Sequence, residues 1–120
     1  MKSGEYLTKS EQYAAVYNKG SSWVNSLLVV KALPNGLALS RCGFSVSQRV
    51  GKAVTRNRVK RLLREIIRQV SLRPGWDIIF IARSPIAAAN YAQIKESVKA
   101  LLFQAQLLMR NDEKVYLKAN

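Results

Sequence analysis

A basic amphipathic segment in the middle of the chain constrains the fold more than any other feature. From Arg49 to Arg73 the sequence contains nine Arg or Lys residues and one acid. At about 100° per residue, apolar residues fall on one face of a helix and basic residues recur every four positions beside them. The apolar face is Val59, Leu62, Leu63, Ile66, Ile67 and Val70. The basic ridge is Arg56, Lys60, Arg64 and Arg68, widened by Asn57 and Arg61. This pattern predicts a helix with one face in a core and the other presented to an anionic ligand.

The start of this helix carries charges that its own electrostatics oppose. Helix N-termini favour acids, because their unpaired N–H groups carry partial positive charge, yet basic residues crowd the first two turns. Like charges four residues apart repel by on the order of a few tenths of a kcal/mol per pair. Because local rules are broken mainly at functional sites, we expect a ligand to supply the missing negative charge.

Overall charge and composition favour nucleic acid as that ligand. The chain has 120 residues, enough for one domain with a real core. A net charge of +13 and a pI near 10.4 favour a polyanion, with nucleic acid ahead of membrane lipid. The single cysteine, Cys42, allows no intramolecular disulfide and fits a reducing compartment. A polar beginning and the lack of a long apolar run predict a soluble, cytoplasmic protein.

The side chains are poorly suited to catalysis. Histidine is absent, which excludes histidine-based acid–base chemistry and a Cys/His zinc site. The seven acids are scattered: Glu5, Glu11, Glu65, Asp77, Glu96, Asp112 and Glu113. A two-metal nuclease needs several converging carboxylates. We therefore expect no catalytic residue and no protein-bound metal, and we expect Cys42 to be a small buried apolar residue.

The first half of the chain predicts a helix followed by a hairpin. Thr8-Lys9-Ser10-Glu11 is typical of a capping box, for a short helix that ends near Gly20. Two apolar runs, 23–33 and 37–46, flank the turn signal Pro34-Asn35-Gly36, which predicts an antiparallel pair of strands.

Tyr13 and Tyr17 lie on one face of this first helix. Two interpretations fit them. Their rings either pack on the sheet or offer a stacking surface to unpaired bases, as in proteins that bind single strands.

The second half predicts a crossover and a long helix. The basic helix is expected over 55–71 with Thr55 as its N-cap, and 76–82 is a continuous apolar strand in the centre of the sheet. A strand, a helix and a strand at this spacing indicate two parallel strands. A helix with a capping box at its start is expected over 90–110, and residues 111–120 are expected to be a mobile tail.

The basic stretch and four blocks around it match a known signature. The central motif is Gly51-Lys52-Ala53-Val54-Thr55-Arg56-Asn57-Arg58-Val59-Lys60-Arg61. The flanking blocks are Tyr13-x-x-Val16-Tyr17-x-x-Gly20, Gly43-Phe44-Ser45-Val46-Ser47, Asp77-Ile78-Ile79 and Ile81-Ala82-Arg83. In this order they closely resemble the protein subunit of bacterial ribonuclease P, over most of the chain.

The resemblance implies both a fold and a division of labour. The fold is α+β, an αβββαβα two-layer sandwich with a mixed central sheet and a left-handed βαβ crossover, which is an exception to the usual right-handed rule. The chain would be a single RNA-binding domain over 1–120. In that ribonucleoprotein endonuclease the RNA subunit carries the active site, uses magnesium and removes the 5′ leader of precursor tRNA. The protein would be an accessory, monomeric subunit.

The resemblance also assigns residues to two RNA surfaces. The catalytic RNA is expected at Arg49, Lys52, Arg56, Asn57, Arg58, Lys60, Arg61, Arg64 and Arg68. The leader is expected in a cleft between the first helix and the sheet, at Tyr13, Tyr17, Val29 and Lys31. Some family members carry tyrosine where this chain has Lys31, so a phosphate contact is expected there in place of stacking. Arginine forks on phosphate and aromatic stacking on single strands agree with this assignment.

Three other functions fit parts of the pattern. A general RNA-binding or ribosomal-type protein would share the charge and fold class, but would not prefer precursor tRNA over mature tRNA. A basic amphipathic helix also suits anionic membranes, although this chain has a core of its own. A nuclease that acts alone would cut RNA without an RNA partner.

Overall fold

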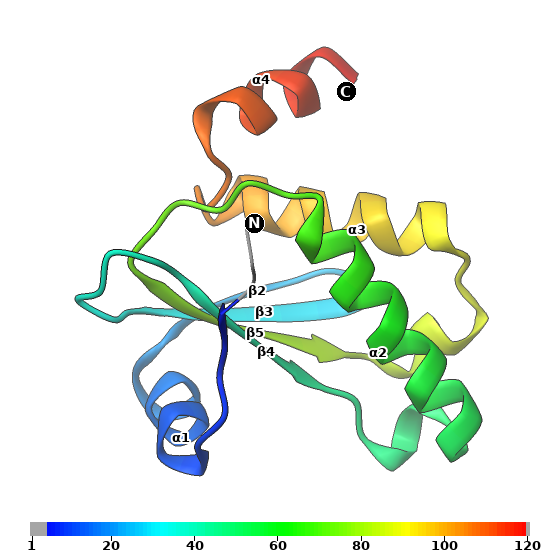
Figure 1. The fold of residues 1–120 in the computed structure, drawn as a ribbon. Helices are drawn as coiled ribbons and strands as arrows, with labels where there is room; N and C mark the ends of the chain where they lie inside the picture. The colour runs from blue at the N-terminus through cyan, green and yellow to red at the C-terminus, as the bar shows by residue number, and fades with distance from the viewer. Residues whose placement is uncertain (1–4, 120) are drawn as a thin grey trace.

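The computed structural model describes residues 5–119, which form an α+β fold around one mixed sheet (Figure 1). The elements are β1 (Glu5–Tyr6), α1 (Ser10–Lys19), β2 (Ser21–Val24), β3 (Leu28–Pro34), β4 (Arg41–Ser45), η1 (Gln48–Val50), α2 (Ala53–Arg68), β5 (Trp76–Ala82), η2 (Ser84–Ala88), α3 (Tyr91–Gln104) and α4 (Arg110–Ala119). Within residues 5–119 the sheet has five strands in the order β1-β4-β5-β3-β2. The predicted αβββαβα order is confirmed, with β1 added before it and α4 after it.

β5 is the central strand and has apolar side chains on both faces. Ile78 and Phe80 belong to the core beneath α2 and α3, whereas Ile79 and Ile81 face α1. β5 pairs in parallel with β4 and antiparallel with β3. A strand of this kind needs cover on both sides, and helices lie on both faces of the sheet (Figure 1).

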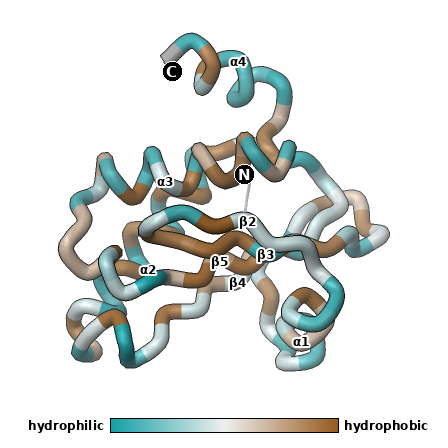
Figure 2. Tube along the Cα trace, turned by 180° about the vertical axis from the view of Figure 1, so that it is seen from behind, coloured by the Kyte–Doolittle hydropathy of each residue, from teal (hydrophilic) through white to brown (hydrophobic). Residues whose placement is uncertain are grey.

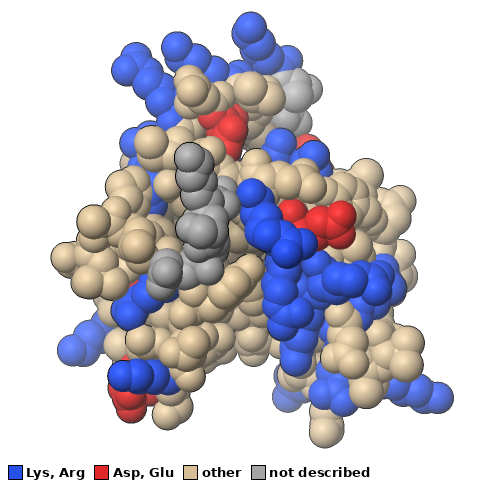
Figure 3. All heavy atoms as spheres, in the orientation of Figure 1, with Lys and Arg blue, Asp and Glu red and all other residues tan. Residues whose placement is uncertain are grey.

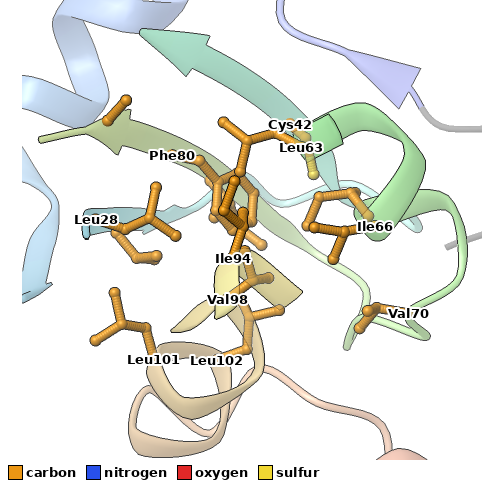
Figure 4. Close-up of a cluster of buried hydrophobic side chains, with 14 of the residues drawn as sticks. Leu28, Cys42, Leu63, Ile66, Val70, Phe80, Ile94, Val98, Leu101 and Leu102 are labelled. Atoms are coloured by element: carbon orange, nitrogen blue, oxygen red, sulfur yellow. The ribbon is translucent and has the colours of Figure 1, made fainter. Parts of the chain in front are cut away.

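The main core lies between the sheet and the pair of helices α2 and α3. Figure 4 shows side chains of β3, β4 and β5 packed against α2 and α3, among them Leu28, Cys42, Phe80, Leu63 and Leu101. In Figure 2 the central strands are mostly hydrophobic, whereas the outer surfaces of the helices carry hydrophilic stretches. This core fixes α2 on the sheet and leaves its polar face outward.

α2 connects β4 to the parallel strand β5. In Figure 1 the chain makes this crossover in the left-handed sense, against the general rule. The crossover that the resemblance implied is therefore confirmed.

The predicted hairpin between residues 23–33 and 37–46 is wrong, because β5 lies between β3 and β4. The turn itself is present. Gly36 has a φ of 72°, in the left-handed region that favours glycine, and the Asn35 side chain accepts a hydrogen bond from the Leu37 amide. Neighbours in sequence usually pair. Here the strand that buries both of its faces takes the central place instead.

The run 23–33 is also divided into two strands by a turn at Asn25. The side-chain Oδ1 of Asn25 accepts hydrogen bonds from the amides of Leu27 at 3.1 Å and Leu28 at 3.0 Å. These bonds satisfy donors that a continuous strand would offer to its neighbours. β2 and β3 consequently form a short antiparallel pair at the edge of the sheet.

The capping prediction for α1 is wrong by one residue. Lys9, not Thr8, occupies the N-cap position. Gln12 rather than Glu11 reaches back, since its Oε1 accepts from the amides of Thr8 at 2.9 Å and Lys9 at 3.0 Å. The amide of glutamine serves as well as a carboxylate in this position.

The other two long helices also differ from the prediction: α2 at both ends and α3 at its C-terminal end. Lys52 replaces Thr55 as the N-cap of α2, which ends a few residues before the predicted 71. The capping box of Asn90 and Gln93 at the start of α3 is confirmed. α3 stops well before the predicted 110, because Gln106 adopts a positive φ of 59° that no helix can continue.

Residues 110–119 form α4, where we expected a tail; Asn120 lies outside the described residues. Tyr116 stacks on Phe103 of α3 with ring centroids 4.9 Å apart. The mobility expected of this segment stays a prediction, but the segment is helical and docked. Within the described part of the chain, no helix is long and apolar enough to cross a bilayer.

A buried ion pair ties β4 to β5. Arg41 donates from Nε and Nη2 to the two carboxylate oxygens of Asp77 at 2.8 and 2.6 Å, and Asn35 donates to the same carboxylate at 2.9 Å. Bidentate pairing of this kind is among the stronger hydrogen-bonding arrangements. Asp77 is 6% exposed, so its charge depends on these donors.

We predict that Asp77→Ala lowers the free energy of unfolding by about 2–4 kcal/mol, because it removes the carboxylate that holds a largely buried guanidinium. The value lies below the full cost of breaking a buried pair, since the Arg41 side chain keeps 22% exposure. Denaturant unfolding measures it. Glu96→Ala is the matched control, because Glu96 is an exposed acid on α3. Equal destabilisation by the two substitutions would contradict the prediction.

Candidate nucleic-acid interface

α2 separates apolar from basic side chains around its axis. Val59, Leu63, Ile66 and Ile67 are fully buried. The first turn contains no acid, and Lys52 stands at the N-cap, so the partial positive charge of the helix start adds to the side-chain charges. Figure 3 shows Lys and Arg side chains gathered over this helix. The positive potential is therefore concentrated on one outward face.

The structure places the residues predicted for the catalytic RNA in two groups. The exposed residues are Arg49, Lys52, Asn57, Arg61, Arg64 and Arg68. The half-buried residues are Arg56, Arg58 and Lys60. Within residues 5–119 no hydrogen bond or ion pair engages the side chains of Arg61, Arg64 or Arg68. Their guanidinium groups are available to an external anion.

Two of the half-buried arginines also hold the fold. Arg58 donates from Nη2 to the carbonyl of Ala87 at 2.9 Å, which fastens α2 to η2. Arg56 donates from Nε to the carbonyl of Gly51 at 3.1 Å, within the approach to the helix. A guanidinium has five N–H donors, so each keeps others for a ligand. Substitution of either residue would change both stability and RNA binding. Arg61 is the better residue for testing RNA binding alone, because its side chain is exposed.

The residues predicted for the leader share one face of the sheet. Val29 and Lys31 of β3 stand opposite Ile81 and Ile79 of β5 in the antiparallel register. Ile79 is fully buried in the small core under α1 with Val16, whereas Val29 and Ile81 remain partly exposed. α1 thus covers one part of this face and leaves an apolar strip of sheet open beside it.

Tyr13 and Tyr17 have different surroundings. Tyr13 is half-buried over Gly43 of β4, where a Cβ atom would lie 2.6 Å from its hydroxyl oxygen, so only glycine lets the ring rest on the strand. Tyr17 is 40% exposed, and its carbonyl accepts from Nζ of Lys31 at 3.4 Å. Tyr13 therefore packs on the sheet, and Tyr17 keeps a ring face toward solvent.

A cleft of about 320 Å³ lies where Tyr13 of the predicted leader set approaches the basic ridge of α2. It is lined by Tyr6, Leu7, Tyr13, Cys42, Phe44, Lys60 and Arg64. The lining includes one residue of the predicted leader set and two of the basic ridge. Aromatic rings and phosphate-binding groups consequently meet at one edge of the sheet.

The sequence did not predict Tyr6 or Phe44 as site residues; their ring centroids are 6.1 Å apart. Strand alternation places Phe44 on one face of its strand with Cys42, but it does not show that this face borders a cleft. No local pattern could have found Tyr6, since its position depends on the parallel pairing of β1 with β4.

A larger cleft, of about 730 Å³, lies between the β2–β3 turn and the start of α3. None of the predicted site residues lines it. Four of its eleven lining residues are alanine, and its one charged side chain is Glu96. Because an acid repels phosphate, the basic and aromatic cleft is the better candidate for RNA.

The one cysteine of the chain is buried in the core. Burial raises the pKa of the Cys42 thiol to about 12, so the thiol is protonated at neutral pH and is a poor nucleophile. Within residues 5–119, no three His, Cys, Asp or Glu side chains come together as they would to hold a metal ion.

Comparison with known proteins identifies relatives over most of the chain. The family model for Ribonuclease P matches residues 1–106. A ribonuclease P protein component from Dehalococcoides mccartyi strain CBDB1 is 48% identical over 120 residues, the whole of both chains. One from Caldanaerobacter subterraneus subsp. tengcongensis is 44% identical over 103 residues, 84% of this chain and 89% of the relative.

Solved structures agree with these matches. The RNase P protein of Staphylococcus aureus superposes with a TM-score of 0.80 at 32% identity, covering 88% of this chain and 99% of that one. The RNase P protein of Thermotoga maritima gives 0.74 at 31% identity, covering 82% and 94%. The matched region contains α2, the sheet and α1, and hence both candidate surfaces. This chain belongs to the family of ribonuclease P protein components.

Proposed function

We propose that this chain is the protein subunit of ribonuclease P and assists a catalytic RNA in removing the 5′ leader from precursor tRNA. The observation that carries the proposal is a cleft whose lining includes Tyr13 of the predicted leader set together with Lys60 and Arg64 of the basic ridge. One surface suits a folded, densely charged RNA, and the other suits a single strand.

The basic ridge of α2 is the docking surface for the catalytic RNA. Arg61, Arg64 and Arg68 are exposed, and a guanidinium binds phosphate bidentately. Each phosphate that they neutralise releases counterions, which drives binding at low salt. The charge repulsion at the start of the helix is relieved in the complex, because RNA supplies the counter-charge that the chain lacks.

The open strip of sheet beside α1 is the leader site. Val29 and Ile81 offer an apolar floor, Tyr17 offers a ring for stacking, and Lys31 offers an ammonium group within reach of phosphate. The bond from Lys31 to the Tyr17 carbonyl is long, at 3.4 Å, so it costs little to exchange for a phosphate contact. Stacking plus backbone charge is how unpaired RNA is usually held.

The chemistry belongs to the RNA subunit in this proposal, and the protein is accessory. The chain has no histidine and only seven dispersed acids, and its one thiol is buried and protonated. Magnesium would be held by RNA phosphates, while the basic side chains lower the charge repulsion around them. The protein acts as a monomer in the cytoplasm, which agrees with a single, buried cysteine that forms no disulfide.

Reconstitution tests the function directly. At low magnesium, the RNA subunit plus this protein is expected to cut precursor tRNA, and neither the protein alone nor the RNA alone should do so efficiently. The complex should also bind leader-bearing tRNA more tightly than mature tRNA. Equal affinity for the two tRNAs would support a general RNA-binding protein, and cleavage by the protein alone would support an independent nuclease.

Arg61→Ala tests the α2 surface. The slope of log affinity for the RNA subunit against log salt should become shallower by about 0.7–0.9 units, the effect of one lost phosphate contact. Stability should change by less than about 0.5 kcal/mol, because the side chain is exposed. Lys19→Ala removes the same charge from an exposed position on α1 and should leave the slope unchanged. An unaltered slope in Arg61→Ala would show that this arginine does not contact the RNA.

Tyr17→Ala tests the leader site. It should weaken binding of leader-bearing precursor tRNA to the holoenzyme by about 1–3 kcal/mol, the usual contribution of one stacked ring. Binding of mature tRNA should not change. Tyr17→Phe keeps the ring and should retain wild-type affinity. Equal losses with both tRNAs would mean that Tyr17 only packs.

A further inference from the structure

α4 begins close to where α2 ends. Residues 71–73, which follow α2, pair with residues 107–109, which precede α4, through two backbone hydrogen bonds of 2.8 Å and an isolated β-bridge. Arg68 closes α2 and Arg110 opens α4. The pairing therefore brings the end of the basic ridge near the start of a second helix, which lies beyond the residues that the family model matches.

The acids of α4 are turned toward the body of the protein. Asp112 accepts a hydrogen bond from the Ser71 amide, and a carboxylate oxygen of Glu113 lies 3.9 Å from Nη2 of Arg73. Tyr116 lies on the same side, stacked on the ring at the end of α3. The negative charges of this helix are thus used in docking it.

The bases of α4 lie on the opposite side. Arg110, Lys114 and Lys118 follow one another at four-residue intervals, within an arc of about 80° at 100° per residue. The same geometry places Asp112 and Tyr116 roughly opposite that arc. All three basic side chains are exposed. We call them the α4 basic face.

Segregation of this kind is the pattern already seen on α2. Like charges four residues apart repel. Of the two acids on α4, Asp112 faces the other way and Glu113 approaches Arg73. Figure 3 shows Lys and Arg side chains over α4 on the same side of the molecule as those over α2. An anion that bound along α2 would meet a second row of cations past its C-terminal end.

We propose that the α4 basic face is a second docking surface for the RNA subunit, which lengthens the contact made by α2. The inference rests on the proposed function of α2 and extends it to a helix outside the family domain. Two rows of cations, about 18 Å long on α2 and about 12 Å long on α4 at 1.5 Å per residue, match an extended phosphate backbone better than a compact anion does.

An anionic membrane fits this helix less well. Val115 and Leu117 are exposed, at 57% and 56%, but they lie on either side of the basic arc, about 160° apart at 100° per residue. A helix that lies in a membrane surface needs one continuous apolar face. α4 has none that is exposed in the described structure, because Tyr116 is stacked against α3.

The test removes the charges and keeps the helix. The triple variant of α4 carries Arg110→Gln, Lys114→Gln and Lys118→Gln. The control variant loses the same charge at the two ends of α1 and on α3, and carries Lys9→Gln, Lys19→Gln and Lys95→Gln. Affinity of the full chain for the RNA subunit is measured over a range of salt. The α4 variant should show a slope shallower by about two units and bind at least about tenfold more weakly near 0.15 M salt. The control should keep the wild-type slope.

Several results would overturn the inference. A slope equal to that of the control would do so, as would a loss confined to precursor tRNA or to anionic vesicles. Lys114→Arg with Lys118→Arg retains the charge and should retain the slope, whereas a loss there would show that charge is not the cause. Arg61→Ala separates the two proposals. If it lowers the slope and the α4 variant does not, α2 still docks RNA and only the second surface is wrong.

Discussion

The arrangement of the other elements depends on β5, because its apolar side chains must be buried on both faces of the sheet. Phe80 and its neighbours on one face are covered by α2 and α3, and Ile79 on the other is covered by α1. α1 has only ten residues and cannot cover a whole face. The uncovered remainder, at Val29 and Ile81, is the strip to which we assign the leader. The candidate substrate site is thus the part of the sheet for which the fold provides no helix.

The distribution of acids explains why the basic surfaces remain uncompensated. Asp77 is held by Arg41 inside the sheet, and Asp112 and Glu113 dock α4 against residues 71–73. These acids serve the structure, so few remain to neutralise α2, where Glu65 is the only one. A net charge of +13 normally disfavours a compact state. The described fold tolerates it by placing basic side chains outward, where solvent and a bound polyanion screen them.

Much of this could be predicted from the sequence, and the failures have physical causes. The periodicity of α2 and the apolar run of β5 dominate their local structure, so β5 was predicted at its observed bounds and α2 with small errors at its two ends. The hairpin prediction was wrong because β3 pairs with β5, whose two apolar faces must both be buried. A turn signal carries no information about that requirement. Tyr6 was missed for a similar reason, since a two-residue strand gains its place only from β4. The individual site residues were predicted from the resemblance to the family signature. The structure shows in addition that some of them, such as Arg58, also stabilise the fold.

In the proposed function the protein is an accessory subunit, and the cleft beside α2 indicates how it would contribute to the reaction. Tyr13 is fixed on the sheet by its fit over Gly43, and Lys60 and Arg64 belong to a helix whose other face is locked in the core. No hinge separates the two surfaces, because both belong to the layers packed on β5. In the proposed complex, a leader bound beside α1 and an RNA bound along α2 are therefore held at a fixed spacing. Holding reactants in place contributes to rate by reducing the entropy lost on reaching the reactive geometry. In the proposed complex, two adjoining RNA surfaces on one fold would perform that task through position and charge.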